Sequence, residues 1–83
     1  MKFIAHINVM PLPNLLDPQG KAVKQVLQNL KYNSVSNVRI GKHITLEFDA
    51  EDEDTAKQIA DEISRKVLTN QVVETYKIKI EAK

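Results

Sequence analysis

The chain has 83 residues, enough for one domain with a modest hydrophobic core. It contains no cysteine, which excludes disulfide bonds and cysteine-based metal sites. A formal net charge of +1, with two Phe, two Tyr and no Trp, gives no indication of a nucleic-acid partner. Because no disulfide bond or cysteine-bound metal ion stabilises so small a core, we expect self-association or assembly with a partner.

The charges are distributed unevenly along the chain. The range 18–46 contains five basic residues and no acidic one, whereas the range 47–66 contains eight acids and three bases. Such an asymmetry either steers complementary assembly or reflects two ordinary solvated faces.

Targeting segments are not expected. His6 and Asn8 interrupt the first apolar run, which argues against a signal peptide. No stretch approaches the roughly 18 apolar residues that a membrane span requires. The sequence therefore predicts a cytoplasmic protein without a membrane partner.

The first part of the chain predicts a strand followed by a helix. Apolar and polar residues alternate over Lys2–Met10, which is typical of a half-buried strand. Asp17 then provides a helix cap, and Pro18 suits the first helical position. The helix is expected over about Pro18–Lys31. Its apolar stripe consists of Ala22, Val23, Val26, Leu27 and Leu30.

Gly20 is unusual in the first turn of this helix. Glycine weakens a helix by up to ~1 kcal/mol relative to alanine, and capping does not need it. A small residue here allows another backbone or an anion to approach closely. A contact site and a packing requirement both remain open as explanations.

The second part of the chain predicts a hairpin, a helix and a final strand. Val35–Phe48 is expected to form the hairpin, with Gly41 supplying a positive φ at its turn. Four consecutive acids at 51–54 suit the start of a helix that ends near Asn70. The buried stripe of this helix is expected to contain Ala56, Ile59, Ala60, Ile63 and Val67. Alternation over 75–81 indicates the last strand.

The element order is therefore β-α-β-β-α-β, the split βαβ or ferredoxin-like arrangement of the α+β class. Right-handed crossovers would place both helices on one face of a four-stranded antiparallel sheet. We expect one domain over residues 1–83. The other sheet face is mixed in character and suits either solvent or a second copy.

The sequence offers no catalytic constellation. His6 and His43 lie on different expected strands, and no spacing supplies the three or four ligands of a metal site. No Ser or Thr lies in a nucleophile elbow. A non-catalytic module remains, either a ligand-binding regulator or an assembly subunit.

Several motifs nevertheless resemble a known family. They are Leu16-Asp17-Pro18-Gln19-Gly20, Val35-Ser36-Asn37-Val38-Arg39-Ile40-Gly41-Lys42, Ala50-Glu51-Asp52-Glu53 and Leu68-Thr69-Asn70 followed by Val72-Val73-Glu74. In this order and spacing the chain resembles the PurS family, the small subunit of phosphoribosylformylglycinamidine (FGAM) synthase in purine biosynthesis.

The resemblance implies a role in a multi-subunit ligase. That enzyme converts formylglycinamide ribonucleotide to FGAM with ATP and glutamine. A large subunit binds ATP, with Mg, and the ribonucleotide, and a glutaminase subunit releases ammonia. A PurS-like chain would bind no cofactor itself; it would form a homodimer and bridge the other two subunits so that ammonia passes between their active sites.

Seven residues are our candidates for partner contact. They are Leu16, Asp17, Gln19, Gly20, Arg39, Gly41 and Lys42. Arg39 is the strongest candidate, because its guanidinium offers a planar two-pronged contact. The alternative is that Asp17 and Gly20 only shape the helix start and Gly41 only turns the chain. A rival function is an ACT-like module that binds a small effector.

Overall fold

The computed structural model describes residues 1–13 and 17–83, and its sheet is built around the N-terminal strand. The elements in chain order are β1 (Lys2–Pro11), α1 (Pro18–Asn29), β2 (Lys42–Asp49), α2 (Glu53–Ile63), a π-helical turn η1 (Ser64–Leu68) and β3 (Glu74–Ala82). Strand β1 lies in the centre, with β2 and β3 antiparallel on either side. Ala5 lies opposite Leu46 on one side and Ile80 on the other.

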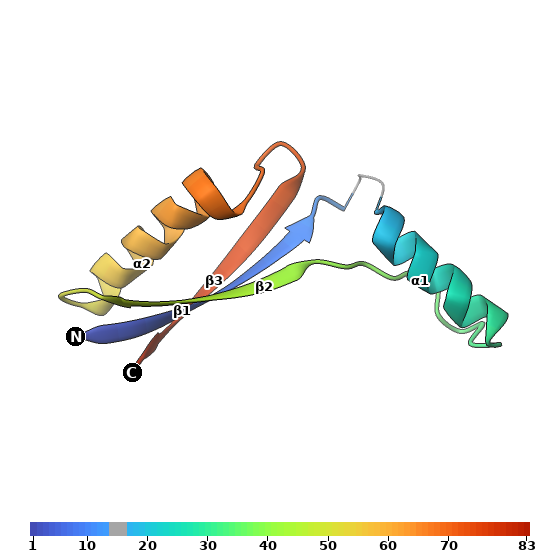
Figure 1. The fold of residues 1–83 in the computed structure, drawn as a ribbon, viewed down its shortest axis with the longest axis horizontal. Coiled ribbons are helices and arrows are strands. Elements are labelled where there is room, and N and C mark those ends of the chain that lie inside the picture. The colour runs from blue at the N-terminus through green and yellow to red at the C-terminus, as the bar shows by residue number, and fades with distance from the viewer. Residues whose placement is uncertain (14–16) are drawn as a thin grey trace.

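The sheet has three strands, so the prediction of a four-stranded sheet is wrong. The missing strand is the first half of the expected hairpin. Residues 35–40 belong to no strand of the sheet, and the chain runs from them directly into β2 (Figure 1). Gly41 does not adopt a positive φ, so it does not form the tight turn that a hairpin would need.

The core lies between the sheet and α2. The inward side chains of β1, from Phe3 to Val9 at alternate positions, are buried, as are Ala56 and Ala60 of α2. These two alanines allow the helix to lie close to the strands. Asp52 caps α2 by accepting a hydrogen bond from the Thr55 N–H at 2.7 Å. The inward residues of β2 and β3, half-buried, complete this layer.

The π-helical turn η1 alters which residues face the core after α2. The Thr69 N–H donates to the Ser64 carbonyl, five residues earlier, at 3.0 Å. Ser64 is fully buried and its hydroxyl donates to the Ala60 carbonyl. Val67, expected on the buried stripe, is 75% exposed, and Leu68 packs against the core instead. That part of the predicted stripe is wrong because the wider turn shifts the helical register.

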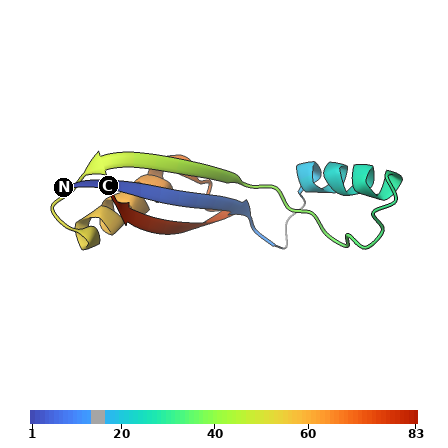
Figure 2. The same cartoon turned by 90° about the horizontal axis from the view of Figure 1, so that it is seen from below.

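Helix α1 lies beyond the end of the sheet, as Figures 1 and 2 show. The prediction that both helices cover one sheet face is therefore wrong, since α2 alone covers it. Lys31, in the left-handed conformation with φ 76°, ends the helix and turns the chain back toward the sheet. We call residues 17–40 the arm. It consists of α1 and the returning segment.

The arm makes the molecule long and thin. The principal extents are 51, 27 and 14 Å, and the radius of gyration is 16.4 Å. A compact domain of this length would have a radius of gyration of about 12 Å. The apolar stripe predicted on α1 is largely uncovered, with Val26 56% and Leu30 61% exposed.

Candidate functional site

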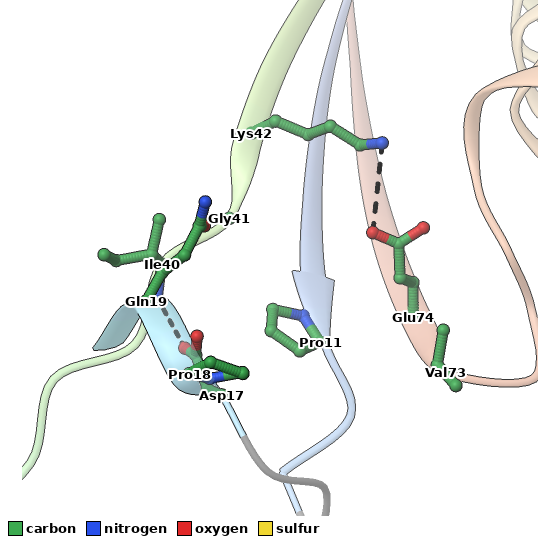
Figure 3. Close-up of a pocket in the computed structure, with 9 residues that line it drawn as sticks. All are labelled: Pro11, Asp17, Pro18, Gln19, Ile40, Gly41, Lys42, Val73 and Glu74. Carbon is green, nitrogen blue, oxygen red and sulfur yellow. Dashed lines mark hydrogen bonds and ion pairs between the residues drawn. The ribbon is translucent and has the colours of Figure 1, made fainter. Parts of the chain in front are cut away.

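Asp17 fastens the arm at the point where it leaves the sheet. One carboxylate oxygen accepts a hydrogen bond from the Gly20 N–H at 3.0 Å, which caps α1. The other accepts from the Ile40 N–H at 2.9 Å, on the returning segment (Figure 3). A single side chain therefore joins the start of the arm to its end.

Gly20 is required by close packing. A Cβ atom at this position would lie 2.2 Å from the Val38 carbonyl oxygen, far inside van der Waals contact. Gly20 is also the buried residue of α1. Of the two explanations that the sequence left open, the structure supports the packing requirement, because the returning segment crosses the first helical turn here.

Arg39 and Gly41 hold the other side of this junction. The Arg39 guanidinium donates a hydrogen bond to the Pro11 carbonyl at the end of β1. A Cβ atom on Gly41 would lie 2.1 Å from the Val9 carbonyl oxygen. Glycine is therefore needed at 41 for close approach to β1, and the prediction of a turn there is wrong.

A hollow of about 720 Å³ opens between the arm and the sheet. Apolar side chains of Pro18 and Ile40 from the arm and of Val73 beside β3 form part of its wall. Lys42 reaches across β1 toward Glu74, with 3.9 Å between ammonium and carboxylate (Figure 3). Lys42 is exposed and Glu74 is half-buried. An ion pair with so long a separation contributes little to stability and leaves the Lys42 ammonium available to a partner.

The junction holds Asp17 in its charged form. Hydrogen bonds from the Gly20 and Ile40 N–H groups, together with the nearby Arg39 charge, lower the pKa of Asp17 from its ordinary value. A carboxylate that accepts two N–H hydrogen bonds stays ionised at neutral pH, so Asp17 has a structural role and is poorly suited to act as a general acid or base.

The structure brings together six of the seven predicted contact residues. Asp17, Gln19 and Gly20 arrive from the start of α1, and Arg39, Gly41 and Lys42 arrive from the returning segment and the start of β2. Leu16 lies outside the described residues. The side chains of Gln19 and Lys42 are exposed, whereas those of Asp17 and Arg39 are half-buried, so Gln19 and Lys42 offer the more accessible side chains for a partner.

A pair of histidines, which the sequence places on different strands, meets on the open sheet face. The rings of His6 and His43 stack with centroids 5.8 Å apart. His6 bonds to Glu81 at 2.8 Å, and His43 to Asn8 at 2.6 Å. The strand register explains this meeting. It pairs His43 with Asn8, and His6 lies two positions before Asn8 on the same face of β1. In the described part of the chain no three His, Cys, Asp or Glu side chains gather as metal ligands.

Among the residues that the structure describes, no helix has the length and apolar character to cross a bilayer.

A small sheet, a projecting arm and an open hollow between them define an assembly module. The chain matches the family model described as "PurS: Phosphoribosylformylglycinamidine (FGAM) synthase" over residues 4–82. It belongs to the PurS family, whose members are subunits of FGAM synthase, a ligase complex of purine biosynthesis. The resemblance found in the sequence is thereby confirmed.

Named relatives and solved structures of PurS subunits support the same family assignment. The PurS subunit of Synechocystis sp. is 49% identical over 70 residues, which covers 84% of this chain and 70% of the relative. The Bacillus subtilis subunit is 40% identical, covering 82% and 80%. The crystal structure of B. subtilis PurS has a TM-score of 0.86 at 35% identity, covering 96% and 99%. A chain of the PurLQS structure from Thermotoga maritima has a TM-score of 0.89 at 33% identity, covering 98% and 99%.

Proposed function

We propose that this chain is the non-catalytic small subunit that bridges the glutaminase and the ATP-dependent large subunit of FGAM synthase. Membership of the PurS family supports the assignment, as does similarity to a chain of the Thermotoga PurLQS structure. The observation that carries it is the shape of the protomer, an elongated body whose arm exposes an apolar stripe. Such a surface is typical of a protein that is covered by partners.

Bridging would prevent the loss of ammonia between the two active sites. Ammonia released by one active site becomes protonated or escapes when it enters water. A rigid subunit that contacts both enzymes holds the sites together and shields the path. A stable contact of this kind buries about 1,600 Å² in total. The hollow at the junction, with Gln19 and Lys42 exposed around it, is our candidate for one such contact.

The remaining features of the assignment follow from the same role. We propose that the chain forms a homodimer, acts in the cytoplasm and leaves ATP and Mg to the large subunit. Nucleic acid and membrane are not partners in this proposal.

Reconstitution tests the bridging role. The chain is mixed with the large and glutaminase subunits of the same cell, and FGAM formation is measured with glutamine and, separately, with ammonium. Omitting this chain should abolish the glutamine-dependent rate and leave the ammonia-dependent rate. Equal glutamine-dependent rates with and without the chain would contradict the proposal. A strong calorimetric signal from the isolated chain with amino acids or nucleotides would instead favour the ACT-like function.

Variants at the hollow locate the contact. Gln19→Ala and Lys42→Ala remove exposed side chains without disturbing Asp17, so each should weaken the complex about tenfold, as for a modest interface hot spot. Lys57→Ala, an exposed lysine of α2, is the matched control and should bind normally. Arg39→Ala should also weaken assembly while the subunit stays folded. This variant is a less specific test of partner contact, because it also removes the hydrogen bond from Arg39 to the Pro11 carbonyl that helps to hold the arm against β1. Normal binding by both variants at the hollow, Gln19→Ala and Lys42→Ala, would exclude this surface.

A further inference from the structure

Strand β3 forms one edge of the sheet, and among the described residues no strand pairs with its outer side. Figure 2 shows β3, in red, along one side of the sheet. Natural edge strands are commonly protected by their shortness, by a proline or by a bulge. Strand β3 has nine residues and no proline, and its register with β1 runs without a bulge from Glu74 to Ala82. Its free edge is therefore long and regular.

Hydrogen bonds at the two ends of β3 show which of its backbone groups face this edge. The Lys83 N–H donates to the Lys2 carbonyl, and the Leu12 N–H donates to the Val73 carbonyl, both at 2.9 Å. In an antiparallel pair, residues alternate between those that bond to the neighbouring strand and those that bond away from it. The odd-numbered residues of β3 therefore bond to β1. The even-numbered residues within 76–80 direct their N–H and C=O groups to the free edge.

The side chains of β3 differ between the two faces of the sheet. Tyr76, Ile78 and Ile80 lie on the core side and remain half-buried, although α2 packs on this strand. Lys77 and Lys79 lie exposed on the opposite face, and among the described residues neither forms an ion pair. A strand added at this edge would meet the isoleucines on one face and the lysines on the other.

We propose that a strand from one of the two partner enzymes pairs with the free edge of β3. This partner strand alternates acidic and apolar residues. Its carboxylates lie beside Lys77 and Lys79, and its apolar side chains lie beside Ile78 and Ile80. Strand addition at a sheet edge gives affinity through backbone hydrogen bonds and specificity through alternate side chains. The proposal rests on the bridging function and names one surface that serves it.

Charge favours an acidic partner strand over a second copy of β3. When two β3 strands overlap completely in antiparallel register, Lys77 of one copy lies opposite Lys79 of the other. Like charges directly opposite each other destabilise such a pair, whereas opposite charges stabilise it. Glu81, on the same face of β3, is bonded to His6 at 2.8 Å. The two lysines therefore remain available to carboxylates of a partner.

Hydrogen exchange read at single residues tests the pairing, first in the isolated chain and then in the complex reconstituted with both enzymes. The N–H groups of Ile78 and Ile80 should exchange rapidly in the isolated chain, because they face the free edge. In the complex their exchange should slow by about tenfold or more. The N–H groups of Lys77 and Lys79 bond to β1 in both states, so they are internal controls and should exchange slowly throughout.

Two results of this experiment would overturn the pairing. Rapid exchange of Ile78 and Ile80 in a complex that sustains glutamine-dependent turnover would show that no strand is added there. Slow exchange of both residues in the isolated chain would show that the edge is already covered without an enzyme. The experiment uses the unaltered chain, so its outcome does not depend on the folding of a variant.

Charge reversal tests the acidic character of the partner strand. Lys79→Glu should weaken binding to one of the two purified enzymes about tenfold. Lys79→Arg keeps the charge and should bind like the parent chain. Lys57→Glu, on the exposed side of α2, changes the net charge by the same amount as Lys79→Glu and is the matched control. Equal affinities of Lys79→Glu and Lys57→Glu for both enzymes, with the folding of each checked by thermal unfolding, would contradict the acidic strand.

Failure of the strand pairing is distinguishable from failure of the bridging function. The pairing alone is refuted if the parent chain restores glutamine-dependent FGAM formation while the edge of β3 stays unprotected. Both the bridging function and the pairing are refuted if that rate does not depend on the presence of the chain.

Discussion

Asp17 connects two segments that are distant in the sequence. Its role as a helix cap was predictable, because Asp before Pro is a familiar start signal. Its second bond, to Ile40, was not, since nothing local relates these positions. The same applies to Gly41: a glycine before a strand indicates a turn or a close approach, and the sequence pattern does not distinguish them.

Replacing Gly20 tests the close approach of the returning segment. Gly20→Ala should destabilise the chain by about 1–3 kcal/mol, the usual cost of overpacking, although alanine favours a helix. The added Cβ would meet the Val38 carbonyl, which is backbone and cannot rotate away. Thermal unfolding measures the effect. Gln25→Ala, at an exposed position of the same helix, is the control and should be neutral or slightly stabilising. An equally mild effect at both positions would refute the packing explanation.

The charge of Asp17 predicts a pH dependence. Its pKa is lowered in the folded chain by the Gly20 and Ile40 N–H groups, so its stabilising effect is present above the ordinary value of 3.8. The effect is lost as the pH falls through the lowered pKa. Asp17→Asn should therefore be less stable than the parent chain at neutral pH, and the difference should shrink as the pH falls below 3.8 and through the lowered pKa of Asp17.

Urea unfolding of both chains across this range measures the difference. Asp52, Glu47 and other carboxyls whose pKa is lowered titrate in both chains and cancel. A difference that stays constant with pH would show that the charge of Asp17 is unimportant.

The helices and strands themselves were largely predictable from their patterns. Alternation located β1 and β3, a capping signal located the start of α1, and the run of acids at 51–54 located the start of α2. The π-helical turn after α2 was not predictable, because a hydrogen bond five residues back leaves no distinctive residue pattern. Its consequence is that Leu68, and not Val67, faces the core.

Two truncations check the register of this turn. Leu68→Ala should cost about 1–3 kcal/mol, less than a fully buried leucine because Leu68 is half-buried. Val67→Ala should change stability by less than about 0.5 kcal/mol, as for an exposed position. Chemical unfolding compares the two. A continuous α-helix would reverse the order, so a larger effect at Val67 would disprove the π-helical turn.

The arrangement of the whole molecule was the least predictable feature. The sequence pattern contains every element of a closed split βαβ domain. In the protomer, however, the chain does not turn at Gly41, and residues 35–40 do not join the sheet. An apolar stripe or an alternating segment specifies that a surface is buried, but it does not specify whether the covering surface belongs to the same copy. Composition does favour a covering surface from another chain, because a chain of this size without disulfide bonds or a structural metal is expected to assemble.

The uneven charge of the chain also takes a spatial form at this scale. Lys21 and Lys24 lie on α1 in the arm, whereas Glu53 and Asp54 begin α2, which covers the sheet. The two helices lie at opposite ends of the molecule (Figure 1), so the basic and acidic residues form separate surfaces. Separate surfaces of opposite charge are suited to different partners.

The ratio of glutamine-dependent to ammonia-dependent FGAM formation by the reconstituted enzyme is the measurement that tests the central claim most directly. We predict that this ratio falls close to zero when this chain is omitted and recovers when the chain is added back. A chain with both Gln19→Ala and Lys42→Ala should need a higher concentration to restore the ratio, whereas Lys57→Ala should match the parent chain. A ratio that does not depend on the presence of this chain would contradict the account.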